Sequence, residues 1–242
     1  MLIIPAIDLK DAQVVRYTKG RLNKKVYSDN PVAVALGWQA QGAKFLHVVD
    51  LDGAFTGKQK NLGVIKKIIK ALSIPVEVSG GIRDLETLKK IIALGAKRVV
   101  LGTRAIEDLS FLKMTIETFG AKVALAVDAS GGKLGLHGWK KSAKLKLKDL
   151  LKDLKKIHLK TVIFTDITRD GTLKGINLTA IKELLESVDR EVIVSGGVSS
   201  LEDISKLVGL SEPNLKGVII GKALYENKFS LKEAIAVSRE KC

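Results

Sequence analysis

The chain has 242 residues, of which 46% are hydrophobic and 28% are charged, and its formal net charge is +15. This composition is typical of a globular protein, and no apolar stretch approaches the roughly 18 residues that a membrane-spanning helix needs. The single cysteine, Cys242, excludes an intramolecular disulfide bond and a cysteine metal site. The N-terminal apolar stretch has no basic leader, so we expect a cytoplasmic protein without a signal peptide.

Short apolar runs alternate eight times with amphipathic runs, which is the pattern of buried parallel strands with helices packed outside them. The sequence predicts strands near residues 2–8, 44–50, 75–79, 97–101, 122–127, 160–165, 191–195 and 216–220. It predicts helices near 31–41, 61–71, 84–94, 108–118, 147–158, 177–187, 200–208 and 230–240. Asn61, Asp84 and Asn177 each precede a helix and are expected to cap it. Because no linker interrupts the alternation, we predict an α/β fold with one (β/α)8 TIM barrel over 1–242.

The chain carries an internal repeat. Val78-Ser79-Gly80-Gly81-Ile82 returns as Val194-Ser195-Gly196-Gly197-Val198, at an offset of 195 − 79 = 116 residues. The same offset relates three further pairs of identical residues, Asp50 and Asp166, Thr56 and Thr172, and Asn61 and Asn177. The repeat predicts two half-barrels, of about 1–120 and 121–242.

In each half, the strand that ends in the glycine pair is followed by a second strand that ends in glycine, Gly102 in the first half and Gly221 in the second. Glycine-ended strand tips expose backbone N–H groups that can bind a phosphate. The two halves therefore predict two phosphate sites.

Carboxylates follow the first predicted strand of each half. Asp8 comes after Ala6-Ile7, and Asp128 comes after Ala126-Val127. Since active sites of (β/α)8 barrels lie at the carboxyl ends of the strands, two matched carboxylates at one pocket suggest an acid and a base. The positive net charge favours a polyanionic substrate, whereas 5% aromatic residues and the lack of a known motif argue against nucleic acid. His47, His137 and His158 lie on different predicted elements, so no metal site is expected.

Taken together, seven motifs resemble the phosphoribosylformimino-5-aminoimidazole carboxamide ribotide (ProFAR) isomerases of histidine biosynthesis. The resemblance covers essentially the whole chain, and it implies an Amadori rearrangement of an aminoaldose to an aminoketose. It further implies a bis-phosphorylated small-molecule substrate, a monomer, and no metal or other cofactor. The motifs are Ile4-Pro5-Ala6-Ile7-Asp8-Leu9, His47-Val48-Val49-Asp50-Leu51, Ser79-Gly80-Gly81-Ile82-Arg83, Asp128, Gly138-Trp139, Asp170-Gly171-Thr172 and Gly221-Lys222-Ala223-Leu224-Tyr225.

The resemblance also implies residue roles. Asp8 is the base, either Asp128 or Asp170 is the acid, and Thr165 orients this centre by hydrogen bonding. The sequence leaves the choice of acid open. Trp139 stacks on the aminoimidazole carboxamide. One phosphate is bound by Gly80, Gly81, Gly102 and Thr103. The other phosphate is bound by Gly171, Thr172, Gly196, Gly197, Gly221 and Lys222. Further contacts from loops to the substrate come from Arg16, Gly20 and Arg83.

The sequence departs from the family pattern at one position, and three other functions compete with the isomerase. Many family members have glycine where this chain has Ala12, so the turn after the first strand is expected to differ. The cyclase subunit of imidazole glycerol phosphate synthase is a sister barrel, but its first strand typically reads Cys-Leu-Asp and it requires a glutaminase partner. A dual isomerase that also converts phosphoribosyl anthranilate shares all the motifs. A non-catalytic barrel would bind polyanions in a salt-sensitive way without turnover.

Overall fold

The computed structural model describes residues 1–18 and 22–240, and its core is a closed barrel of eight parallel strands. The strands pair in the order β10-β11-β12-β1-β4-β5-β6-β7, and β7 pairs with β10 to close the barrel. The fold is therefore the predicted (β/α)8 barrel. The barrel strands are β1 (Leu2–Lys10), β4 (Leu46–Asp50), β5 (Val76–Ser79), β6 (Arg98–Leu101), β7 (Val123–Ser130), β10 (Thr161–Asp166), β11 (Glu191–Ser195) and β12 (Leu215–Ile220).

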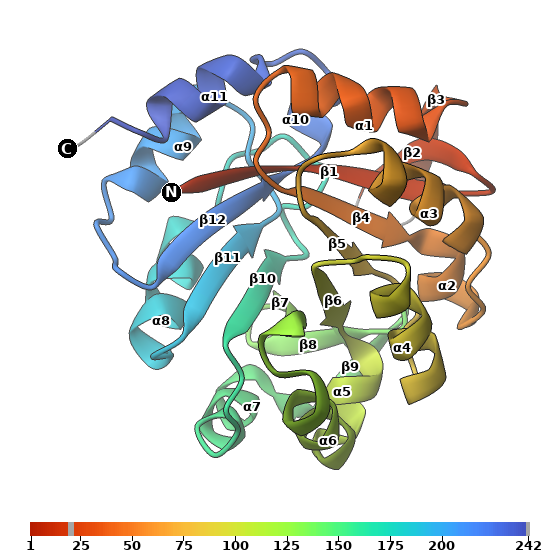
Figure 1. Ribbon diagram of the computed structural model, residues 1–242. Helices are drawn as coiled ribbons and strands as arrows, with labels where there is room; N and C mark the ends of the chain where they lie inside the picture. The colour runs from red at the N-terminus through yellow and green to blue at the C-terminus, as the bar shows by residue number, and fades with distance from the viewer. Residues whose placement is uncertain (19–21, 241–242) are drawn as a thin grey trace.

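Eight helices follow the strands and surround the barrel (Figure 1). Each of them falls where the amphipathic pattern predicts a helix. None of the helices in the described ranges is long and apolar enough to cross a membrane. The helices are α1 (Pro31–Ala40), α3 (Leu62–Ala71), α4 (Leu85–Ala93), α6 (Leu109–Phe119), α7 (Leu147–Leu154), α8 (Leu178–Ser187), α9 (Leu201–Val208) and α11 (Leu231–Val237).

The strands are buried on both faces because successive side chains point alternately into the barrel and out toward the helices. Residues such as Val48, Val78 and Val99 point outward and join the large core between strands and helices. The inward residues form a second, smaller core inside the barrel, built from Ile4, Ala6, Val100, Ala124, Ile163, Ile193 and Ile219. This inner core lies beneath the polar side chains at the carboxyl ends of the strands, and it forms the bottom of the pocket there.

Two hairpins and several short helices extend the loops at the strand ends. One hairpin, β2 (Gln13–Thr18) with β3 (Leu22–Ser28), follows β1, and another, β8 (Lys133–Leu136) with β9 (Lys141–Lys146), follows β7. The hairpins thus come after the first strand of each predicted half, at the two places where Asp8 and Asp128 stand. The short helices are α2 (Leu51–Thr56), α5 (Thr103–Glu107), the 3-10 turn η1 (Gly120–Lys122) and α10 (Lys222–Tyr225).

Two of the three predicted helix caps are confirmed. Asp84 accepts a hydrogen bond from the Thr87 backbone N–H at 2.7 Å, and Asn177 accepts one from the Ala180 N–H at 3.3 Å. The prediction for Asn61 is wrong, because its side chain makes no capping bond to α3. Its amide is directed instead at the buried carboxylate of Asp50.

Candidate active site

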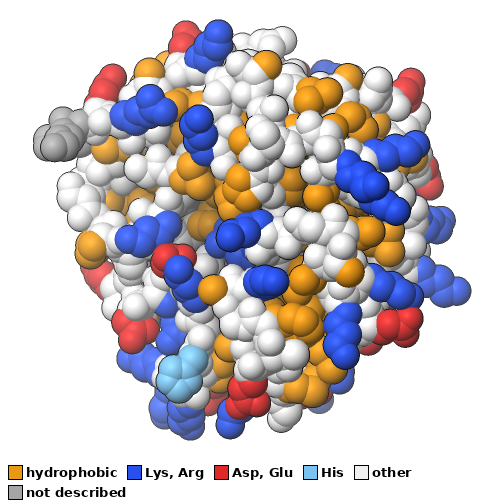
Figure 2. All heavy atoms as spheres, viewed as in Figure 1, with side chains coloured by type: hydrophobic (Ala, Val, Ile, Leu, Met, Phe, Trp, Pro, Cys, Tyr) orange, Lys and Arg blue, Asp and Glu red, His pale blue; other side chains and the backbone are white. Residues whose placement is uncertain are grey.

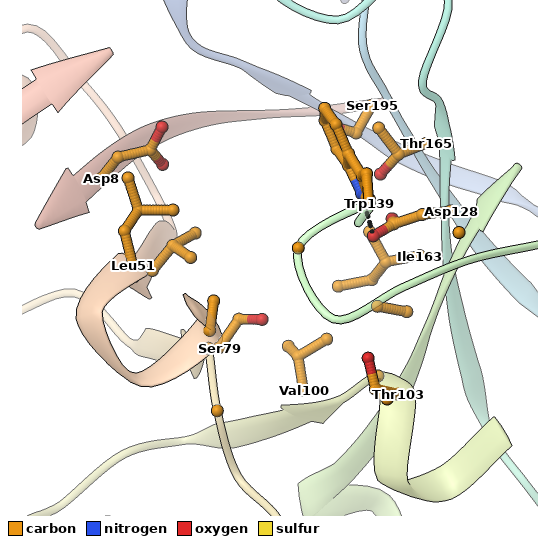
Figure 3. Close-up of a pocket in the computed structure, with 18 of the residues that line it drawn as sticks. Asp8, Leu51, Ser79, Val100, Thr103, Asp128, Trp139, Ile163, Thr165 and Ser195 are labelled. Atoms are coloured by element: carbon orange, nitrogen blue, oxygen red, sulfur yellow. Dashed lines mark hydrogen bonds between the residues drawn. The ribbon is translucent and has the colours of Figure 1, made fainter. Parts of the chain in front are cut away.

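A pocket at the carboxyl ends of the strands collects most of the residues that the sequence singled out. Asp8 and Asp128 lie on opposite sides of it (Figure 3). A smaller pocket is lined by some of the same side chains, Arg16 and Asp170 among them. The larger pocket is lined by Asp8, Arg16, Gly80, Gly81, Arg83, Gly102, Thr103, Asp128, Trp139, Thr165 and Asp170. The smaller one also takes in Gly171, Gly196, Gly197, Gly221 and Lys222.

The β2–β3 hairpin brings a guanidinium group to Asp8. Asp8 sits on β1 opposite Val15 of β2, and Arg16 follows on the same strand. The Arg16 Nη1 lies 2.7 Å from Asp8 Oδ2, and its Nη2 donates to the carbonyl oxygen of Ala6 at 3.2 Å. Both side chains are largely buried, with 12% and 14% exposure for Arg16 and Asp8. A charge-assisted bond of this kind is strong and directional, so it fixes the position of the Asp8 carboxylate at the pocket.

The β8–β9 hairpin brings a neutral donor to Asp128 in the corresponding way. The indole Nε1 of Trp139 donates to Asp128 Oδ2 at 2.8 Å (Figure 3). Burial raises the pKa of Asp128, while hydrogen bonds from Trp139 and Thr165 and the charge of His47 offset part of that rise. The hairpin is also tied to the first glycine site, because the His137 N–H donates to Thr103 Oγ1 at 2.8 Å.

Asp170 is the second carboxyl group of the pocket whose pKa is raised. Burial, together with the negative charges of Asp8 and Asp128, raises its pKa to about 6, even though Arg16 and Lys222 act in the opposite direction. It lies in the loop after β10, and it lines both pockets. A carboxyl group with such a pKa holds a proton near neutrality far more often than an ordinary aspartate does. The arrangement therefore places a carboxylate paired with a cation and a carboxyl group of raised pKa around the same cavity.

The glycine pairs of the two halves pack directly on neighbouring backbone. Gly80 has φ +101°, and a Cβ atom there would overlap the carbonyl oxygen of Asp50. Gly196, its counterpart at the 116-residue offset, has φ +87° and would place a Cβ 2.9 Å from the carbonyl oxygen of Asp166. Only glycine fits both the conformation and the space. The repeat thus builds two equivalent glycine-lined sites at the pocket.

Sequence reasoning missed a buried charged cluster beneath the pocket. His47 of β4 lines the cavity, and its Nδ1 lies 2.7 Å from Oε1 of Glu77, a fully buried residue of β5. Arg98 of β6 contacts the other Glu77 oxygen at 2.7 Å. Burial alone would raise the pKa of Glu77, but the bonds and charges of His47 and Arg98 outweigh it and hold that pKa below its usual range. The sequence feature that could have revealed this cluster is Glu77, a charged residue at an inward-facing position of an otherwise apolar strand.

Two predicted residues are not placed in the pocket. Thr172 lines neither cavity, and its hydroxyl donates to the carbonyl oxygen of Arg169 at 2.7 Å. Gly20 lies outside the described residues. Within the described ranges, no three His, Cys, Asp or Glu side chains come together as a metal site. Lysine and arginine side chains are spread over the face shown in Figure 2 and exceed the acidic ones there.

Fold and site together define a (β/α)8-barrel protein whose pocket carries opposed carboxyl groups and two repeated pairs of glycines. A family model described as histidine biosynthesis protein matches residues 2–230, and the chain belongs to this family.

Its relatives include three proteins that are each named 1-(5-phosphoribosyl)-5-((5-phosphoribosylamino)methylideneamino) imidazole-4-carboxamide isomerase. The protein of Syntrophomonas wolfei is 45% identical over 100% of both chains. That of Pelotomaculum thermopropionicum is 46% identical over 98% of this chain and 92% of its own. That of Alkaliphilus metalliredigens is 45% identical over 96% and 97%.

Proposed function

We propose that this protein is an aldose–ketose isomerase that converts ProFAR into its phosphoribulosyl isomer in histidine biosynthesis. The proposal is supported by the names of relatives that match nearly the whole chain. The observation that carries it is the grouping of three carboxyl groups around one pocket. Asp8 pairs with the cation of Arg16, and Asp128 and Asp170 both have a raised pKa. An Amadori rearrangement needs one group that accepts the C2 proton and one that protonates the ring oxygen.

In this proposal Asp8 is the base, and Asp170 is the acid. Asp170 is chosen because burial and the charges of Asp8 and Asp128 raise its pKa to about 6, so that it can hold a proton near neutrality. Asp128 accepts hydrogen bonds from Trp139 and Thr165, which favour its ionised form. Thr165 then orients Asp128, and the indole of Trp139 is available to stack on the aminoimidazole ring.

The two glycine-lined sites fix the substrate between these groups. Each would hold one phosphate through backbone N–H donors, so that the ribose carbon atoms lie near Asp8 and Asp170. Lys222 belongs to the second site, where its ammonium group donates to the Gly171 carbonyl at 2.8 Å. Arg83 and Arg16 supply further positive charge at the pocket. We propose that the protein acts as a cytoplasmic monomer on this small molecule alone.

The test measures turnover of ProFAR by the purified chain after treatment with EDTA. A parallel assay offers phosphoribosyl anthranilate as the substrate. We expect the ribulosyl isomer of ProFAR to form, and we expect Asp8→Asn to remove most of the rate while the phosphates still bind. Turnover of both compounds would identify a dual isomerase. Conversion of the ribulosyl product with ammonia would favour the cyclase, and salt-sensitive binding without any turnover would overturn the proposal.

A further inference from the structure

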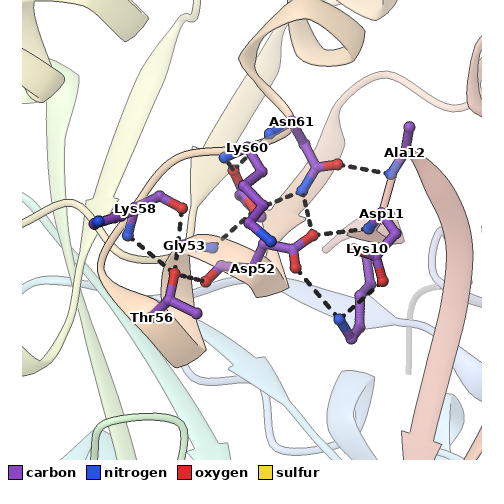
Figure 4. Close-up of polar contacts among 10 residues, drawn as sticks. Lys10, Asp11, Ala12, Asp52, Gly53, Thr56, Lys58, Lys60 and Asn61 are labelled. Atoms are coloured by element: carbon purple, nitrogen blue, oxygen red, sulfur yellow. Dashed lines mark hydrogen bonds and ion pairs between the residues drawn. The ribbon is translucent and has the colours of Figure 1, made fainter.

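A polar network joins Asp52 and Asn61 in the segment that follows β4 (Figure 4). The first glycine pair packs against the same segment, because a Cβ atom at Gly81 would overlap the backbone of Gly53. Asp50 is fully buried, and its carboxylate accepts hydrogen bonds from the backbone N–H groups of Gly53 at 2.9 Å, Lys60 at 3.2 Å and Asn61 at 3.1 Å. The Asn61 Nδ2 donates to Asp50 at 2.6 Å and to Asp52 at 3.0 Å. We call Asp50, Asp52 and Asn61 the loop network.

The second half repeats only part of this network. Asn177 Nδ2 donates to Asp166 at 2.7 Å, as Asn61 does to Asp50. The position that matches Asp52, at 168 − 52 = 116 residues, is Thr168, whose hydroxyl donates to Asp166 at 2.6 Å. Holding the loop therefore does not require a carboxylate at position 52. The buried Asp52, with 2% exposure, calls for a separate explanation.

The further contacts of the loop network go to the turn that joins β1 to β2. Asp52 Oδ2 accepts the N–H of Asp11 at 2.7 Å, and Asp52 Oδ1 lies 3.3 Å from the ammonium group of Lys10. Asn61 Oδ1 accepts the N–H of Ala12 at 2.9 Å. Together these bonds engage the backbone of both central residues of the turn.

This turn is strained. Lys10 pairs with Gln13, so the turn has two central residues, Asp11 with φ +49° and Ala12 with φ +62°. A two-residue hairpin turn of this kind favours glycine at the second position, because side chains resist the left-handed conformation. Here alanine occupies that position. Hydrogen bonds to both backbone N–H groups stabilise the conformation that the side chain disfavours.

The strand that leaves this turn carries Arg16. Its guanidinium group pairs with Asp8 and packs so closely on Gly221 that a Cβ atom there would overlap it. We propose that Asp52, supported by Asn61, is a positioning residue that fixes the β1–β2 turn and thereby holds Arg16 between Asp8 and Gly221. Hydrogen bonds from Asp11 and Asn61 and the Lys10 charge outweigh burial and hold the pKa of Asp52 below its ordinary value, so the group stays ionised. The catalytic consequence rests on the proposed function.

The kinetic test replaces Asp52 by alanine and measures kcat and KM for ProFAR. We expect kcat to fall about tenfold and KM to change less than about threefold, because the glycine backbone of both sites keeps its conformation while Arg16 loses its register beside Asp8. The control is Ser230→Ala, which removes the capping box of α11 and leaves the pocket untouched. Equal kcat values in the two variants would overturn the proposal.

A second substitution separates positioning from simple destabilisation. Glycine adopts the left-handed conformation without a steric penalty, so adding Ala12→Gly to Asp52→Ala should stabilise the turn without the network. We expect the double variant to regain at least about half of the lost kcat, measured against Ala12→Gly alone. A double variant as slow as Asp52→Ala would contradict the role assigned to the turn.

Amide hydrogen exchange tests the same contacts without any substrate. In Asp52→Ala the amides of residues 11–16 should exchange faster than in Ser230→Ala, and those of the barrel strands should not. Unchanged exchange at residues 11–16 would overturn the proposal. If the wild-type chain does not turn over ProFAR, the proposed function fails alone, and the exchange experiment still decides whether Asp52 holds the turn.

Discussion

Replacing Asp170 by asparagine should make the protein more stable and less active at neutral pH. Burial and two neighbouring carboxylates raise the pKa of Asp170 from 3.8 to about 6. A carboxyl group whose folded pKa is raised stabilises the fold below the unfolded pKa, and this stability is lost as the pH rises through about 6. Raising the pKa from 3.8 to about 6 corresponds to a cost of about 3 kcal/mol for the ionised group well above that pH. Asparagine keeps the shape and carries no charge, so this cost disappears.

Urea unfolding at two pH values measures the effect. We expect Asp170→Asn to exceed the wild type by up to about 3 kcal/mol near pH 7.5 and by less than about 1 kcal/mol near pH 4, where the wild-type group is protonated. If Asp170 is the acid, kcat for ProFAR should fall by at least about 100-fold in the same variant. Equal stabilities near pH 7.5, or a gain that does not depend on pH, would refute the reasoning.

Three further substitutions test the other pocket residues. Asp8→Asn should lower kcat by at least about 1000-fold with ligand affinity nearly intact, measured by calorimetry with the ribulosyl product; retained turnover would refute the base assignment. Asp128→Asn should lower kcat less than the Asp170 variant does, and the reverse order in parallel kcat measurements would move the acid to Asp128. Gly81→Ala should cost about 2 kcal/mol or more in urea unfolding, because its φ of +68° and the Gly53 backbone exclude a Cβ; unchanged stability would contradict that geometry.

The barrel could be predicted from the sequence because parallel strands buried on both faces appear as continuous apolar runs. Each of the eight runs became a barrel strand, with ends close to those expected. The helix ends were less accurate. The predicted helix 147–158 ends at Leu154, although Ile157 continues the apolar stripe and packs on the core. An amphipathic pattern reports which side chains are buried, and it continues past the point where the backbone leaves the helix.

The contacts that complete the site could not be predicted, because they depend on how the loops fold back onto the strand ends. Asp52 reaches Asp11 across 41 positions, and Trp139 reaches Asp128 only because a hairpin folds back over the pocket. Asn61 stands where a helix cap is expected, yet its amide bonds Asp50, whose buried carboxylate needs donors more than the helix end does. Local patterns predict an element, whereas the partners of a buried charge depend on the assembled fold.

The repeat gives the pocket two similar ends, and the difference between its carboxylates comes from the hairpins. Both hairpins follow the first strand of a half and return a side chain to the aspartate at that strand's tip. One returns the cation of Arg16 to Asp8, the other the neutral indole of Trp139 to Asp128. The two matched aspartates therefore have different partners, and burial raises the pKa of Asp128, the one that faces the neutral donor. Under the proposed isomerisation, this difference assigns proton abstraction to the Asp8 side of an otherwise repeated site.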